Sequence, residues 1–60
     1  MNEDLRKKLV LIKVVASELL PRTKDIKYLE IITTCNILLD GECDEKQIQA
    51  EIDNLVAKIS

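Results

Sequence analysis

Hydrophobic residues recur with a helical period along residues 3–20, and they spread beyond a single face. The main stripe repeats at steps of four and three residues, which is the spacing of a helix that buries one side. Its members are Leu5, Leu9, Ile12, Ala16 and Leu19. Between Leu9 and Ala16 only Lys13 is polar. The pattern predicts a helix over residues 3–20 that ends at Pro21, because a proline ring disfavours the helical conformation at the residue before it.

Two further apolar pairs flank this stripe. Val10 and Val14 lie on one side of it, and Leu11 and Val15 lie on the opposite side. A helix that buries a single face does not need them, so they predict a surface that another element or another chain covers. The β-branched run also permits a strand that pairs with its twin in a dimer, as in ribbon-helix-helix DNA-binding proteins. Residues 9–12 do not alternate between apolar and polar, which favours the helix.

A second helical pattern covers residues 24–39. The turn at residues 21–23 precedes it, and Thr23 is its predicted N-cap. Its apolar stripe consists of Tyr28, Ile31, Ile32, Cys35, Leu38 and Leu39. Leu29 and Ile37 fall outside this stripe, so they too need cover from another surface.

A third helical pattern covers residues 45–58 and is the most one-sided of the three. Its stripe consists of Ile48, Ile52, Leu55, Val56 and Ile59. The preceding turn is predicted at Asp40-Gly41-Glu42, where Gly41 can take the left-handed conformation that often ends a helix. Asp44 is the predicted N-cap of this helix.

These patterns predict one all-α domain over residues 1–60, either a small three-helix bundle or a helical hairpin with a third helix packed against it. Leu, Ile and Val make up 21 of the 60 residues, which exceeds the interior positions of so small a unit. A domain of this size hides only roughly 60% of the surface of its unfolded chain. The surplus therefore predicts that dimerisation completes the fold, with a homodimer formed through the first helix with help from the second.

Charge is distributed unevenly along the chain. Residues 1–28 carry seven basic and four acidic side chains, a net charge of +3. Residues 29–60 carry two basic and seven acidic side chains, a net charge of −5. The two halves attract each other, either within one chain or between two antiparallel chains.

The residue types argue against chemistry. The chain has no His, and its two cysteines do not have the spacing of a zinc site. We therefore expect no enzyme activity, no cofactor and no metal. Cys35 is expected to be buried as a small hydrophobe, and Cys43 to pack against the start of the third helix.

The sequence therefore favours a small protein that binds another protein through an apolar helical surface, as a regulator, inhibitor or adaptor. The predicted interface consists of Val10, Leu11, Val14, Val15, Leu29 and Ile37. Whether a second copy or a different protein covers it stays open at this point. The alternative is a small DNA-binding regulator of helix-turn-helix or ribbon-helix-helix type, against which the pI near 5.0 argues.

The chain is also expected to be cytoplasmic, with reduced thiols. Lys13 interrupts the only long apolar run, which argues against a signal peptide. No segment reaches the roughly 18 apolar residues that a membrane-spanning helix needs.

Overall fold

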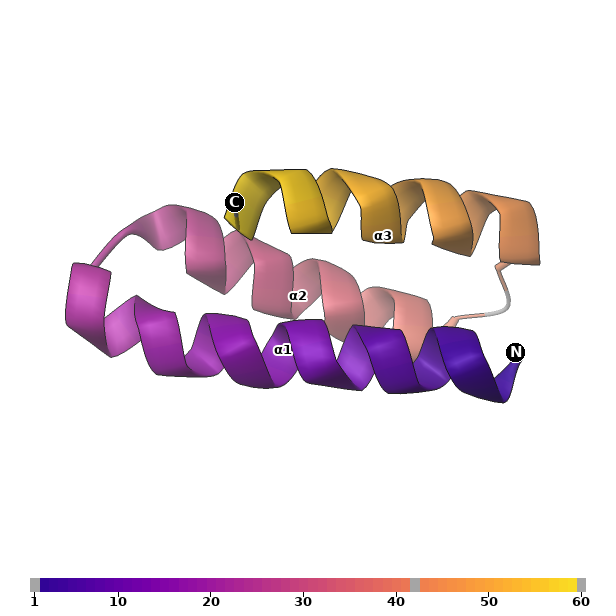
Figure 1. Cartoon of the computed structure of the whole chain (residues 1–60), viewed down its shortest axis with the longest axis horizontal. Helices are drawn as coiled ribbons and strands as arrows, with labels where there is room; N and C mark the ends of the chain where they lie inside the picture. The colour runs from indigo at the N-terminus through magenta and orange to yellow at the C-terminus, as the bar shows by residue number, and fades with distance from the viewer. Residues whose placement is uncertain (1, 42, 60) are drawn as a thin grey trace.

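A computed structural model of the chain describes residues 2–41 and 43–59. These residues form three α-helices and no strand: α1 (Glu3–Thr23), α2 (Ile26–Asp40) and α3 (Glu45–Ile59) (Figure 1). The all-helical prediction is confirmed. The strand alternative for residues 9–12 is wrong, because this run lies in the middle of α1.

The first two helices form an antiparallel hairpin, and α3 lies along that hairpin in the same direction as α1 (Figure 1). The packing between α1 and α2 is the most extensive, and that between α2 and α3 the least. The molecule measures 32 × 18 × 15 Å and has a radius of gyration of 11.0 Å, close to the roughly 10 Å expected for a folded chain of this length. Both predicted arrangements describe it: a hairpin with a third helix, closed into a three-helix unit.

One stripe of each helix supplies the core. The buried residues are Leu5, Leu9, Ile12 and Ala16 of α1, Tyr28, Ile31, Cys35 and Leu38 of α2, and Ile48, Ile52 and Leu55 of α3. Among the residues described, no polar or charged side chain is buried. The core is therefore held by apolar packing alone, and it uses three or four residues from each helix.

The end of α1 differs from the sequence prediction. The helix continues through Pro21 to Thr23. Two local hydrogen bonds support this extra turn: the Thr23 hydroxyl donates to the Leu19 carbonyl (2.9 Å), and the Lys24 N–H donates to the Leu20 carbonyl (2.8 Å). A proline one turn from a helix end removes one backbone donor, and these bonds satisfy the neighbouring carbonyls, so the helix does not stop there.

The start of α2 is also corrected. Asp25, and not Thr23, is its N-cap, since the Asp25 carboxylate accepts a hydrogen bond from the Lys27 N–H (3.0 Å). The Thr23 hydroxyl instead accepts from the Asp25 N–H (3.2 Å) and closes the preceding helix. At α3 the prediction holds, because the Asp44 carboxylate accepts from the Lys46 N–H (2.9 Å).

The left-handed conformation predicted at Gly41 is not found there. Lys24 at the end of α1 takes the left-handed conformation, with φ 57°, whereas Gly41 at the end of α2 has φ −88° and ψ 161°. Gly41 is required for a different reason: a Cβ at this position would lie 2.9 Å from the Ile37 carbonyl oxygen, which accepts the Gly41 N–H. Glu42, the last residue of the predicted turn, lies outside the described residues.

Candidate protein-binding surface

Five of the six predicted interface residues are exposed. The exposed fractions on α1 are 44% for Val10, 63% for Leu11 and 50% for Val14. On α2, Leu29 is 48% and Ile37 62% exposed, and on α1 the sixth residue, Val15, is half-buried.

The partial burial of Val15 follows from its position beside α3. Lys8 and Asp4 of α1 line a depression together with Lys46 and other residues at the start of α3. This side of α1 therefore faces α3. Val15 lies two turns after Lys8, on the same side of the helix, so α3 provides part of the cover that its sequence position predicted.

The face of α1 that points away from the core carries a regular stripe, which we call the outer stripe. Its members repeat at steps of four and three residues: Glu3, Lys7, Val10, Val14, Ser17 and Pro21. All six are exposed. At about 3.6 residues per turn, this stripe lies on the opposite side of the helix from Leu5, Leu9 and Ile12. It has the spacing of a coiled-coil seam, with valines at its centre and charged residues at its N-terminal end.

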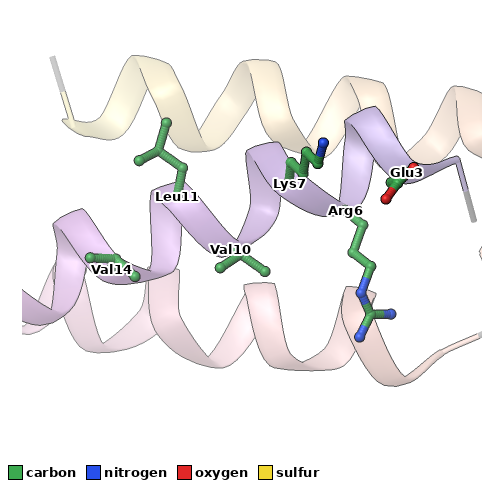
Figure 2. A pocket seen from close by; sticks show the side chains of 6 residues that line it. All are labelled: Glu3, Arg6, Lys7, Val10, Leu11 and Val14. Atoms are coloured by element: carbon green, nitrogen blue, oxygen red, sulfur yellow. The ribbon is translucent and has the colours of Figure 1, made fainter.

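A shallow depression of about 410 Å³ follows the first half of this stripe. It is lined by Glu3, Arg6, Lys7, Val10, Leu11 and Val14. All six residues belong to α1, so the depression is open helix surface and not a cleft between elements. Figure 2 shows Val10 and Val14 at the edge of α1 on the side of α2, while Leu11 points toward the side of α3. The structure thus brings Val10, Leu11 and Val14 to one surface.

The exposed residues of α2 form a separate surface, since none of them lines the α1 depression. Leu29 and Ile37 lie on the face of α2 turned away from its buried stripe, together with Ile26, which is 68% exposed. Sequence reasoning missed Ile26, although its spacing of three residues from Leu29 was a usable signal. The Thr33 hydroxyl lies between them along this face and donates to the Leu29 carbonyl (3.0 Å).

One residue of α3 departs from the predicted pattern. Val56 was assigned to the buried stripe, but it is 48% exposed. A residue that follows Leu55 directly lies about 100° further round the helix, so it reaches only the margin of the buried face. The remaining stripe, Ile48, Ile52, Leu55 and Ile59, keeps the predicted spacing.

The two cysteines are free thiols. Cys35 is buried in the core as predicted, and Cys43 is half-buried against it. Burial raises the pKa of the Cys35 thiol, and the positive charge of Lys13 on α1 opposes part of this rise. A raised pKa keeps the thiol protonated and unreactive at neutral pH.

Within residues 2–41 and 43–59, no group of three or more His, Cys, Asp or Glu side chains is placed to hold a metal ion. In the same residues, no helix combines the length and the apolar character needed to cross a membrane.

Comparison with known proteins gives no match: no family model, no curated protein and no solved structure is significantly similar to this chain.

Proposed function

We propose that this chain is a non-enzymatic protein-interaction protein, a regulator, inhibitor or adaptor, that binds through the outer faces of its helices. The observation that carries the proposal is the exposure of Val10, Leu11 and Val14 on one surface of α1, opposite the core. Contiguous exposed apolar residues with a charged rim mark interaction surfaces in small proteins. The charged residues Glu3, Arg6 and Lys7 supply that rim at one end.

The geometry favours docking of a helix along α1. Exposed apolar side chains at steps of four and three residues form one line along a helix for several turns. A partner helix that lies along α1 can therefore contact all of them. Burying each valine or leucine side chain contributes about 1.5–3 kcal/mol relative to leaving it in water. Because Val10, Leu11 and Val14 are only about half exposed, each has about half of that gain left, so a partner must also contact the rest of the outer face to offset the loss of translational and rotational freedom.

A site-specific photo-crosslinker tests this proposal in the native cell. The crosslinking amino acid replaces Leu11 on the proposed surface in one variant and Ala50, an exposed residue of α3, in a matched control. We expect covalent adducts to a protein chain from position 11 and few or none from position 50. Equal adduct yields at the two positions, or no adduct at position 11, would contradict the proposal.

A further inference from the structure

The outer stripe of α1 and the exposed residues beside it are self-complementary, and we propose that their occupant is a second copy of this chain with the two α1 helices antiparallel. This inference rests on the proposed function and names the partner. Two features carry it: the order of charges along α1, and the position of the stripe on the side opposite the core.

The charges define a register. The two-fold axis is placed between residues 12 and 13 of each α1. Each residue then faces the residue of the second copy for which the two residue numbers add up to 25. Lys7 then faces Glu18 of the second copy, and Glu3 faces Arg22 of the second copy. Each pairing occurs twice because the dimer is symmetric. Opposite charges that flank an apolar seam set the orientation of paired helices.

A parallel pair would place identical residues opposite each other. Lys7 would then meet Lys7, and Glu18 would meet Glu18, at both ends of the apolar segment. Like charges across an interface oppose association. The sequence of α1 therefore selects the antiparallel orientation.

The same register fits the apolar residues. Val14 faces Leu11 of the second copy and Val10 faces Val15, and both contacts repeat on the other side of the axis. Leu11 lies close to the axis, so the two copies of Leu11 are separated by only about 4–5 Å along the helices. Leu11 is the most exposed of the three apolar residues in the α1 depression, at 63%. It therefore has the most apolar surface to bury.

The fold leaves room for this contact. The outer stripe lies on the side of α1 opposite the core. Within one chain α2 and α3 both pack on the other side of α1 (Figure 1), so a second copy can approach the outer stripe. Ser17 directly precedes Glu18, and its small side chain leaves space for the Lys7 stem of the second copy to reach Glu18. The Ser17 hydroxyl already donates to the Lys13 carbonyl (2.8 Å), so covering it leaves no unpaired donor.

The Lys7–Glu18 pairing cannot form inside one chain. The two residues are separated by eleven positions on the same straight helix, about 16 Å along its axis. Within the described part of the chain, neither side chain has an ion-pair partner. A charge exchange between them is therefore a specific probe of the second copy.

Sedimentation equilibrium of the full chain and three variants tests the register. The interface is small, so we expect a dissociation constant on the order of 100 μM for the native chain. Lys7→Glu alone and Glu18→Lys alone each create two repulsive contacts in the dimer and should weaken it about tenfold. The double variant Lys7→Glu/Glu18→Lys should regain native affinity to within about threefold.

The monomer cannot produce this rescue. Within one α1 helix, Lys7→Glu adds repulsion from Glu3, and Glu18→Lys adds repulsion from Arg22, in both cases four residues away. These small penalties accumulate in the double variant. A double variant that dimerises no better than the single variants overturns the register, and a native chain that stays monomeric at about 1 mM overturns the dimer.

Engineered disulfides test the orientation independently. On a Cys43→Ser background, Leu11→Cys should form a covalent dimer under mild oxidation, because the two copies lie near the axis. Lys7→Cys is the matched control, since an antiparallel pair separates its two copies by about 16 Å. Rapid crosslinking of Lys7→Cys, or its absence at Leu11→Cys, contradicts the antiparallel pair.

These outcomes separate the two proposals. If the native chain is monomeric but position 11 crosslinks to a different protein, the dimer fails and the proposed function stands. If position 11 crosslinks to nothing and the chain is monomeric, both fail.

Discussion

α1 and α3 lie in the same direction in this bundle, but their outer faces differ. Each helix contributes one buried stripe to the core: four residues from α1 and three from α3. The face of α3 opposite its stripe carries Lys46, Ala50, Asp53 and Ala57, all exposed and none of them large and apolar. The corresponding face of α1 carries Val10 and Val14 at its centre. The core of the monomer thus uses one stripe from each helix, and Val10 and Val14 of α1 lie outside it.

The inner and outer faces of α1 also differ in what they contribute energetically. Buried side chains stabilise the monomer, whereas exposed apolar side chains contribute little until another chain covers them. Truncation on the inner face of α1 should therefore lower the free energy of unfolding, and polar substitution on its outer face should lower only the affinity for a partner.

The largest expected effect comes from truncating a core residue. Leu9 is fully buried, and Leu9→Ala should lower the free energy of unfolding by about 3 kcal/mol, from lost burial and the cavity left behind. Its control, Leu11→Ala on the outer side, should change it by less than about 0.5 kcal/mol. Urea unfolding followed by circular dichroism at about 10 μM, well below the proposed dissociation constant of the dimer, measures both. Comparable losses in the two variants would break the distinction between inner and outer faces.

A smaller effect is expected from charges placed on the outer stripe. Val10→Glu/Val14→Glu should weaken self-association at least about tenfold, because it puts carboxylates into the apolar centre of the contact. The variant should remain a folded monomer. The matched control, Ala50→Glu/Ala57→Glu, adds the same charges at exposed positions of α3 and should leave association unchanged. Light scattering after gel filtration reports the association, and circular dichroism reports the fold.

If the α1 variant unfolds, Val10 and Val14 belong to the stability of the monomer, and the comparison with α3 loses its meaning. If the α3 control weakens association equally, net charge and not the outer stripe controls it.

The helix periods and stripes could be read from the sequence because packing repeats over many residues, and no single residue decides it. The buried positions of α1 and α3 follow the predicted steps of four and three, and Val56 alone left its stripe. The surplus on α1 was visible for the same reason: Val10 and Val14 keep a helical step while they avoid the buried stripe.

Helix ends were harder to predict, because single hydrogen bonds decide them. Thr23 and Asp25 can both cap a helix, and the structure uses Thr23 to close α1 and Asp25 to open α2. The half-burial of Val15 depends on where α3 lies, which the pattern of α1 alone does not contain. Ile26 was missed because it stands at the very start of its helix, where a stripe is hardest to recognise.

The smallest expected effect is the pH dependence of the stability that Cys35 contributes from the buried side of α2. Burial raises the folded-state pKa of the Cys35 thiol. The thiol therefore contributes its full stabilisation below the ordinary cysteine pKa of about 8.5, and this contribution is lost as the pH rises through the raised folded-state value. The difference in unfolding free energy between the native chain and Cys35→Ala should be constant up to about pH 8 and shrink above it.

Urea titrations at a series of pH values measure this difference. Both proteins contain the same lysines and Tyr28, so any pH dependence from these groups cancels in the subtraction. A difference that grows with rising pH would contradict burial of a neutral thiol.

The apolar part of the outer stripe on α1 ends near Pro21. Because proline has no N–H, it cannot donate the hydrogen bond that the Ser17 carbonyl would otherwise accept within the helix. A peptide carbonyl without its helical donor keeps its attraction for water. The stripe therefore changes from apolar side chains at Val10 and Val14 to a polar backbone group one turn later. We expect close apolar contact along this helix to stop at this carbonyl group.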